Sequence, residues 1–249
     1  MPAAADAAAM PDIHDITPFT LLDYPDELAC IVWFAGCNLR CVYCHNPGIV
    51  HGKGKFGAED YEAFLHQRRG KLSGVVLSGG EPTLCARLPS YARTAKEMGF
   101  KIKLDTNGTR PRMIEHLLDE KLVDYVALDF KCPPHLGKAL LGTAKFMPLF
   151  AQSLRLLIER QSDIRLEIRT TFHGDHMHES DLAQMAETLD AQGYKGVYYV
   201  QNIVSTGDKT LGNIAPPSRL PAAAPYAENF TVDFRNFPAQ EVSMRNGDL

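Results

Sequence analysis

Short apolar runs and longer amphipathic runs alternate along most of this 249-residue chain. The short runs are rich in β-branched residues and are typical of buried strands, whereas the longer runs have the period of helices. Because parallel strands need crossover connections, this alternation predicts an α/β fold with a parallel sheet. Strands are expected at residues 28–35, 74–78, 101–104, 124–130, 164–171 and 196–201, and helices at residues 58–69, 88–98, 111–120, 147–161 and 180–191.

The number of strand–helix units limits the kind of sheet. The expected strands and helices occupy about 170 residues, which is too little chain for the eight units of a full barrel. We therefore expect an open, partial (β/α)6 barrel over residues 19–204, preceded by an N-terminal tail at residues 1–18. Residues 205–249 are expected to form a loop-rich C-terminal extension, in which residues 230–234 fit an edge strand.

Charge and hydropathy exclude several classes of partner. The formal net charge is −4, and the sequence has none of the clustered basic charge that nucleic acids and anionic membranes attract. No apolar run approaches the roughly 18 residues of a membrane span, and the first residues lack the basic region of a signal peptide. A cytoplasmic protein with no nucleic-acid or membrane partner is expected, and reducing cytosol would keep its cysteines available as ligands.

Three cysteines, Cys37, Cys41 and Cys44, follow the first expected strand with the spacing C-x3-C-x2-C. Three thiolates can hold three corners of a [4Fe–4S] cluster and leave one iron open, whereas a purely electron-carrying cluster takes four cysteines. A structural zinc site is an alternative, with His45 or His51 as its fourth ligand. A group of buried thiols without a ligand is a second alternative, because free cysteine is often buried.

Polar segments follow the next expected strands at the points where these strands end. Residues 78–82 read Ser-Gly-Gly-Glu-Pro, and residues 105–108 read Asp-Thr-Asn-Gly. Asp129 and Lys131 follow a further strand, and Arg169 lies late in the fifth. Each segment taken alone also fits ordinary turn and cap chemistry. Because active sites of parallel α/β folds form at the carboxyl edge of the sheet, we expect these groups to meet there.

Taken together, these motifs identify a family resemblance. The cysteine spacing, with Tyr43 before its last cysteine, and the later Gly-Gly-Glu resemble the signature of the radical S-adenosylmethionine (radical SAM) superfamily. The Cys-His-Asn-Pro that ends at Pro47 and the Asp-Thr-Asn-Gly resemble the activating enzymes of glycyl-radical proteins. Residues 20–25 and residues 169–171 fit the longer type of activating protein for anaerobic ribonucleoside-triphosphate reductase, and the resemblance covers residues 19–201.

The resemblance implies a role for each matching residue. Cys37, Cys41 and Cys44 would bind the [4Fe–4S] cluster; Tyr43 would lie beside the adenine of SAM; Gly79, Gly80 and Glu81 would position its methionyl amine; Asp105, Thr106 and Asp129 would line a region for a monovalent cation and the SAM carboxylate; and Lys131 and Arg169 would contact SAM.

The resemblance also implies an oxidoreductase of anaerobic metabolism. Reductive cleavage of SAM would yield a 5′-deoxyadenosyl radical that takes a hydrogen atom from a glycine of a partner protein, here anaerobic ribonucleotide reductase. Flavodoxin or ferredoxin would supply the electron. A radical SAM enzyme with a small-molecule substrate, similar to deazapurine synthases, is an alternative, and a non-catalytic metal-binding regulator is another.

Two features depart from the family pattern, and a third segment has the composition of a metal-binding tract. Cys132 follows Lys131 and is expected as a thiol at the rim of the site. The chain after Ile203 matches the family poorly, so its role and the choice of partner stay open. Residues 173–178 contain three histidines, but polar loops before helices often carry such residues, and a loop is expected there rather than a metal site.

Overall fold

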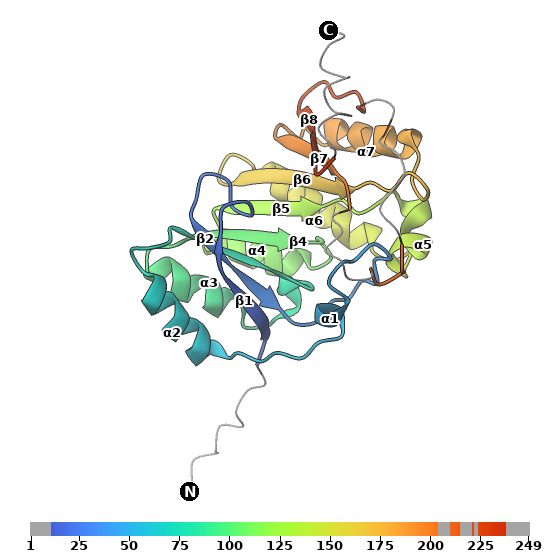
Figure 1. Ribbon diagram of the computed structural model, residues 1–249. Coiled ribbons are helices and arrows are strands. Elements are labelled where there is room, and N and C mark those ends of the chain that lie inside the picture. Colours follow the sequence, from blue (N-terminus) through green and yellow to red (C-terminus); the bar gives the residue numbers. More distant parts are fainter. Residues whose placement is uncertain (1–10, 204–209, 215–220, 222–223, 238–249) are drawn as a thin grey trace, which may run out of the picture.

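One eight-stranded sheet organises the protein, and its strands lie side by side in sequence order from β1 to β8 (Figure 1). The computed structural model describes residues 11–203, 210–214, 221 and 224–237. The strands are β1 (Ile13–Thr20), β2 (Ala29–Phe34), β3 (Gly74–Gly79), β4 (Lys101–Thr106), β5 (Tyr125–Asp129), β6 (Arg165–Thr171), β7 (Val197–Gln201) and β8 (Thr231–Arg235).

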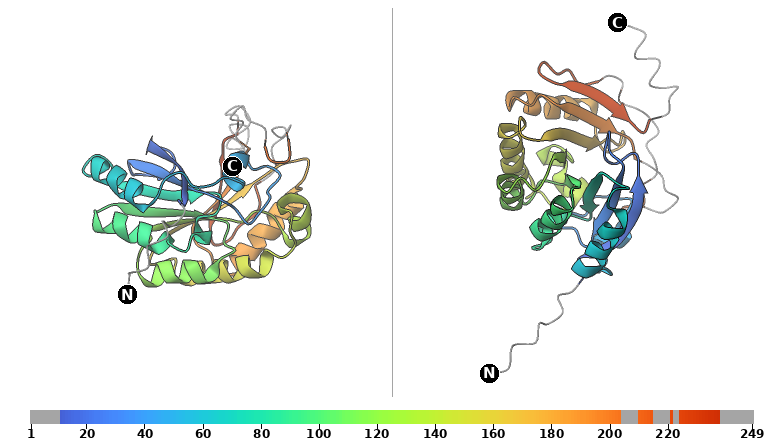
Figure 2. Two further views of the ribbon diagram at one scale, coloured as in Figure 1. Left: turned by 90° about the horizontal axis from the view of Figure 1, so that it is seen from below. Right: turned by 90° about the vertical axis from the view of Figure 1, so that its left-hand side faces the viewer.

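Helices connect the parallel strands and cover the outer face of the curved sheet (Figure 2). They are α1 (Pro47–Val50), α2 (Ala58–Arg68), α3 (Leu88–Glu97), α4 (Pro111–Asp119), α5 (Gly137–Leu141), α6 (Met147–Glu159) and α7 (Glu179–Ala191), with short 3-10 turns at Pro82–Leu84 and Pro134–Leu136. Proline stands in the first turn of α3, α4 and α6, where a missing N–H costs no hydrogen bond. None of the helices in the described part of the chain has the length and apolar character needed to cross a membrane.

Strands β2 to β7 are all parallel, which confirms the predicted partial barrel. Strand β1 pairs with β2 in the antiparallel direction, and β8 pairs with β7 in the parallel direction. No pairing joins β1 to β8 within the described residues, so the barrel stays open along one side. The predicted edge strand at residues 230–234 is confirmed, with a shift of one residue, as β8.

The N-terminal prediction was wrong in part. Residues 1–18 were expected to form a tail, but β1 begins at Ile13 and pairs with β2. Ile13 is fully buried, and Ile16 pairs opposite Val32. Pro18 and the polar residues around it obscure the strand in the sequence, although an edge strand tolerates a proline. Residues 1–10 and most of residues 205–227 lie outside the described residues.

The two faces of the sheet differ in character, because side chains alternate between them along each strand. The outer face is apolar and packs under the helices to form the main core, with fully buried residues such as Leu77, Leu104 and Ile168. The inner face has a small apolar cluster at the amino ends of the strands, where the rings of Tyr24 and Tyr125 lie 5.7 Å apart. Charged residues occupy the inner face above this cluster, toward the carboxyl ends of the strands.

Candidate active site

A cavity of about 390 Å³ lies at the carboxyl ends of the parallel strands. All twelve residues that the sequence analysis placed in a site line this cavity. They come from the loop after β2, from the carboxyl-terminal parts of β3, β4, β5 and β6 and from residues that directly follow β3 and β5, so the topology brings together segments that are far apart in the sequence. The lining residues in question are Cys37, Cys41, Tyr43, Cys44, Gly79, Gly80, Glu81, Asp105, Thr106, Asp129, Lys131 and Arg169.

The three cysteines lie on one loop between β2 and α1. All six cysteines of the chain are free thiols, and Cys41 is the most buried of these three. The backbone N–H of Leu39 donates to Cys37 Sγ at 3.4 Å, which orients this thiol. Burial raises the pKa of Cys41 to about 11 and also raises the pKa of Cys37. Because metal binding needs thiolates, loading of this loop must release protons.

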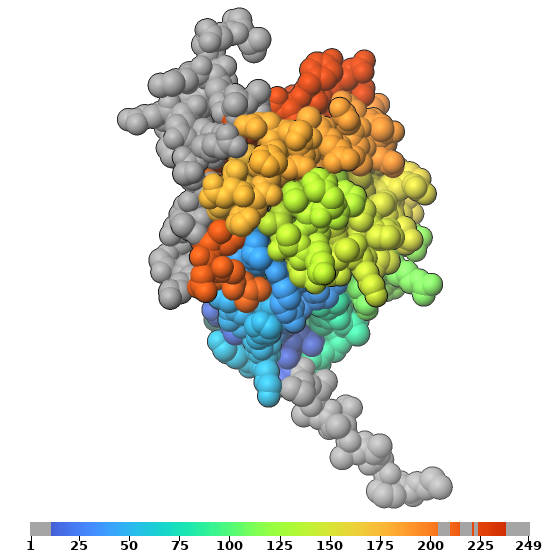
Figure 3. All heavy atoms as spheres, turned by 90° about the vertical axis from the view of Figure 1, so that its right-hand side faces the viewer, coloured from blue at the N-terminus to red at the C-terminus, as the bar shows by residue number. Residues whose placement is uncertain are grey.

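Both edges of the cysteine loop pair with other parts of the backbone. On one edge, the N–H groups of Arg40 and Val42 donate to the carbonyls of Leu141 and Leu140, at 3.0 and 2.9 Å. On the other edge, the carbonyl of Cys44 accepts from Leu211 N at 2.8 Å, and that of Val42 accepts from Gly212 N at 2.7 Å. Figure 3 shows part of the C-terminal extension in orange-red beside the blue loop region. The extension therefore holds the cysteine loop in place.

The donor set favours a cluster over a single metal ion. Among the described residues, no three His, Cys, Asp or Glu side chains converge closely enough to hold one ion. A single zinc needs such convergence, whereas a [4Fe–4S] cluster binds each cysteine through a different iron. His45 lines the cavity, and its pKa is lowered by burial and by nearby Lys131. Three thiols on a loop beside a polar cavity fit a cluster with one open iron.

The glycine segment after β3 packs tightly against the end of β2. Gly79 has a φ of +124°, and a Cβ there would lie 2.3 Å from the backbone N of Phe34. A Cβ on Gly80 would lie 2.0 Å from the carbonyl oxygen of Gly36. The carbonyls of Phe34 and Gly36 accept hydrogen bonds from Gly80 N and Glu81 N, both at 2.9 Å. The glycines are thus required where this segment meets the start of the cysteine loop.

Glu81 is nearly fully buried and has no free oxygen. Its carboxylate accepts from the N–H and the hydroxyl of Thr83, from the hydroxyl of Thr106 at 2.8 Å and from Asn107 N at 2.7 Å. Burial raises its pKa, and these four hydrogen bonds oppose the rise. The side chain joins the segment after β3 to the segment after β4, so Glu81 holds the two segments together.

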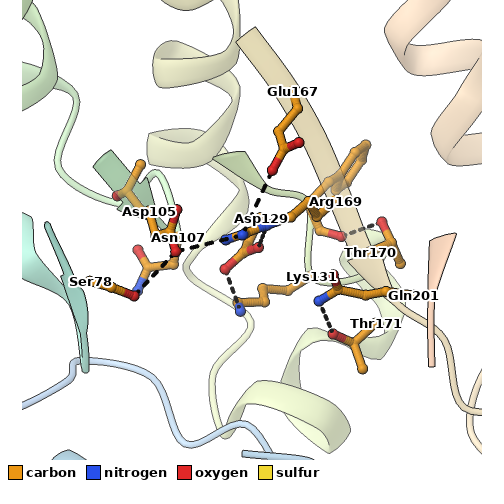
Figure 4. A network of polar contacts seen from close by, with 12 residues as sticks. Ser78, Asp105, Asn107, Asp129, Lys131, Glu167, Arg169, Thr170, Thr171 and Gln201 are labelled. Atoms are coloured by element: carbon orange, nitrogen blue, oxygen red, sulfur yellow. Dashed lines mark hydrogen bonds and ion pairs between the residues drawn. The ribbon is translucent and has the colours of Figure 1, made fainter. Parts of the chain in front are cut away.

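Four charged residues form the floor of the cavity, and Figure 4 shows Arg169 at the centre of their network. Arg169 Nε donates to Asp129 Oδ1 at 2.9 Å, and Arg169 Nη1 lies 3.6 Å from Asp105 Oδ2. Lys131 Nζ donates to Asp129 Oδ2 at 2.9 Å. Burial alone would raise the pKa of Asp129, but Arg169 and Lys131 hold it at about 2. The floor is therefore ionised at neutral pH.

A second group of charges lies beneath this floor and was missing from the sequence analysis. Lys103 Nζ donates to Asp105 Oδ1 at 2.6 Å and lies 3.9 Å from Glu167 Oε1. Arg235, on β8, donates to Glu167 Oε2 at 3.1 Å. The available signal was spacing, because Lys103 precedes Asp105 by two positions and Glu167 precedes Arg169 by two. Residues two apart in a strand share a face.

Two further expectations concern Cys132 and the histidine-rich residues 173–178. Cys132 is fully buried in the main core and is not among the residues that line the cavity, so its prediction as a rim thiol was wrong. Burial raises its pKa to about 12. The histidine-rich residues 173–178 form a turn before α7, in agreement with the expected loop.

Comparisons with known proteins identify the family of this chain. The family model of the radical SAM superfamily matches residues 31–189. A Methanocaldococcus jannaschii protein, provisionally named a glycyl-radical enzyme activating enzyme, is 34% identical over 184 residues, or 71% of this chain and 75% of that protein. The pyruvate formate-lyase 1-activating enzyme of Escherichia coli K12 is 35% identical over 131 residues, or 48% of this chain and about half of that enzyme (51%).

Solved structures share the fold at low sequence identity. The crystal structure of Streptococcus suis SuiB superposes with a TM-score of 0.59 and 15% identity, over 81% of this chain and 47% of SuiB. A structure of anSMEcpe with bound AdoMet gives a TM-score of 0.55 at 18% identity, over 69% of this chain and 49% of that protein. Both agree with a partial barrel and a mostly parallel sheet.

Proposed function

We propose that this chain, which belongs to the radical SAM superfamily and to its glycyl-radical enzyme activating enzymes, acts on anaerobic ribonucleoside-triphosphate reductase. Its product would be a glycyl radical on that protein. The observation that carries the proposal is the convergence of all twelve expected site residues on one cavity. The motifs of residues 20–25 and 169–171 favour the reductase over other glycyl-radical proteins.

Cys37, Cys41 and Cys44 would hold the [4Fe–4S] cluster. When bound, the cluster and SAM supply the chemistry, in which one-electron cleavage of SAM gives methionine and a 5′-deoxyadenosyl radical that takes a hydrogen atom from the glycine Cα. The protein binds and orients SAM and keeps water away from the radical. Flavodoxin or ferredoxin is the proposed electron donor, and a cytoplasmic location would keep the free cysteines reduced.

The other site residues would orient SAM. Lys131 and Arg169 place positive charge on the cavity floor, where the SAM carboxylate would bind. The backbone of Gly79 and Gly80 would receive the amine, with Glu81 holding this segment against the segment after β4. Tyr43 lines the cavity beside the cysteines, and its hydroxyl donates to the Lys131 carbonyl at 3.3 Å, so its ring is held beside the place proposed for the adenine.

The size of the cavity favours a protein substrate over a small molecule. Its volume of about 390 Å³ lies at the low end of the roughly 300–1,000 Å³ of small-molecule pockets. It must take SAM beside the cluster, which leaves little room for a second small molecule. A glycine loop of a partner can instead enter from the open side of the barrel. A small-molecule substrate, as in deazapurine synthases, is the second candidate and predicts SAM turnover with that compound alone.

Electron paramagnetic resonance on anaerobically reconstituted protein tests the proposal. The protein would be mixed with SAM, a reductant and the anaerobic ribonucleotide reductase of the same organism. We expect the doublet of a glycyl radical only when every component is present. Formation of 5′-deoxyadenosine with no doublet would refute the reductase as partner, and a lack of both signals from cluster-loaded protein would refute the activity.

Two cysteine variants provide a matched pair for this test. Cys41→Ala removes a proposed cluster ligand and should abolish the doublet, the iron content above background and the cleavage of SAM. Cys132→Ala removes a fully buried thiol that does not line the cavity, and it should keep all three. Loss of the cluster in both variants, or in neither, would contradict the ligand assignment.

A further inference from the structure

The floor of the cavity is the place where a monovalent cation was expected, in a region lined by Asp105, Thr106 and Asp129. Each side-chain oxygen of these residues already has a partner. Asp105 Oδ1 accepts from Lys103, and Asp105 Oδ2 accepts from Ser78 Oγ at 3.2 Å. The hydroxyl of Thr106 donates to Glu81 and accepts from the backbone N–H of Gly108 at 3.1 Å.

The second carboxylate is equally engaged. Asp129 Oδ1 accepts from Arg169, and Asp129 Oδ2 accepts from Lys131, both at 2.9 Å. Three cationic side chains therefore contact two carboxylates on this floor (Figure 4 shows Asp105, Asp129, Lys131 and Arg169). An added Na⁺ or K⁺ would have to displace a side-chain cation from a site that carries no excess negative charge. The predicted cation does not fit these residues.

Among the three cations, Lys103 differs in position. Lys131 and Arg169 line the cavity, where an incoming carboxylate of SAM can reach them. Lys103 does not line the cavity, and only 2% of its side chain is exposed. Its ammonium lies 5.2 Å from the ring centroid of Tyr125 and 3.9 Å from Glu167. It can thus keep its contact with Asp105 while Lys131 and Arg169 turn toward a ligand.

We infer that the buried ammonium of Lys103 serves as the built-in counter-cation of Asp105, so that this protein binds SAM without Na⁺ or K⁺. Lys103 is a positioning residue in this inference, because it acts on the ligand through Asp105 and does not touch SAM. Arg169 also lies 3.6 Å from Asp105, but it lines the cavity and can turn toward a ligand, whereas Lys103 cannot reach one. A buried carboxylate that loses the cation that stays with it is costly to keep ionised, and a small cation from solution could then take the vacated position. The inference rests on the SAM site of the proposed function.

The test measures binding of SAM to the cluster-loaded protein by equilibrium dialysis, so its readout is separate from activity. Chloride salts of K⁺, Na⁺ and tetramethylammonium are compared at equal ionic strength, because tetramethylammonium is too large to enter a carboxylate site. The Kd of the unmodified protein should agree within about twofold across the three salts, as expected when no inorganic cation takes part in binding. The Lys103→Met variant should bind SAM roughly tenfold more weakly in tetramethylammonium and recover in K⁺ or Na⁺.

Lys101→Met is the matched control. Lys101 lies two positions earlier on β4, but its side chain is 60% exposed and pairs with Glu27 at the far end of the strand. This variant should bind SAM as the unmodified protein does, in all three salts. Its behaviour separates the loss of one positive charge from the loss of this particular ammonium.

Each outcome decides the inference. A Kd of the unmodified protein that rises tenfold or more in tetramethylammonium would overturn it, and this arm decides even if Lys103→Met does not fold. A folded, cluster-loaded Lys103→Met that binds weakly in every salt, or normally in every salt, would also overturn it. Absence of SAM binding by the unmodified protein in all salts would instead refute the proposed SAM site, and the inference with it.

Discussion

The two faces of the same sheet carry opposite kinds of side chain, apolar on one and charged on the other. The outer face is apolar and buried under the helices, whereas the inner face carries Lys103, Asp105, Glu167 and Arg169 within hydrogen-bond or ion-pair distance of one another. On β4 the contrast falls on adjacent residues, because Leu104 points into the main core between Lys103 and Asp105.

This difference separates stability from function. Burial of apolar surface stabilises the outer face, and this stabilisation does not require side chains to point at particular partners. Charges on the inner face must leave water, and their mutual attraction repays that cost only when each is paired and hydrogen-bonded. A protein that needed only stability would do as well with apolar residues on the inner face, so the charges there indicate a ligand with charges of its own. Substitutions on the two faces should therefore have different consequences.

Arg169→Met should have the largest effect. It leaves Asp105, Asp129 and Glu167 close together with one cation fewer, and breaking a buried ion pair costs about 4 kcal/mol. Urea denaturation would measure this loss, and SAM affinity should fall with it. Arg165→Met is the control on the same strand, because its pair with the exposed Asp26 contributes at most about 1 kcal/mol. Equal losses in the two variants would contradict the role of the inner network.

Leu104→Ala should have the next largest effect, with a different signature. Leu104 is fully buried on the outer face, and truncation of such a leucine costs about 3 kcal/mol through lost transfer energy and a residual cavity. The charges on either side are untouched, so SAM affinity of the folded protein should stay within about twofold of its original value. Stability from urea denaturation and Kd from dialysis distinguish the two effects. A weakened Kd at unchanged stability would show that the two faces are not independent.

Asp129→Asn should change the pH dependence of stability by a smaller amount. The folded-state pKa of Asp129 is about 2, below its usual 3.8, so its ionised form contributes about 2 kcal/mol of stability. The sign for a lowered pKa is that this contribution is complete above about pH 5 and is lost as the pH falls through 3.8 toward 2. The difference in stability between the two proteins should therefore shrink by roughly half between pH 6 and pH 3, as measured by urea denaturation. A constant difference across that range would contradict the shift.

Tyr125→Phe and Tyr198→Phe should give the smallest losses of stability, and the difference between the two losses tests the contrast between the two faces. Tyr125 donates to Glu167 on the inner face at 2.5 Å, whereas Tyr198 donates to the hydroxyl of Thr170 in the main core at 2.8 Å. A hydrogen bond to a charged group contributes about 1.5 kcal/mol or more, and one to a neutral group about 1 kcal/mol. Urea denaturation of both variants should rank Tyr125→Phe as the more destabilised. The opposite ranking would indicate that the charge of Glu167 adds nothing to its hydrogen bond.

Sequence patterns were sufficient where neighbouring residues carry the information. The cysteine triplet lies on one loop, and the segments at residues 78–82 and 105–108 each end a strand, so parallel topology alone was enough to place them at one edge. Prediction failed for β1 because Pro18 interrupts its pattern and its pairing partner, β2, decides that it is a strand. It failed for Cys132 because the burial of a side chain after a strand depends on the helices packed above it.

Local sequence patterns were enough to predict the alternation of strands and helices, the proposed cluster ligands and the family. The contacts among Lys103, Glu167 and Arg235 beneath the cavity, and the pairing of residues 210–214 with the cysteine loop, became visible in the folded protein alone. These groups lie far apart along the chain. Residues on β4, β6 and β8 meet through the register and curvature of the whole sheet, and no local pattern records those contacts.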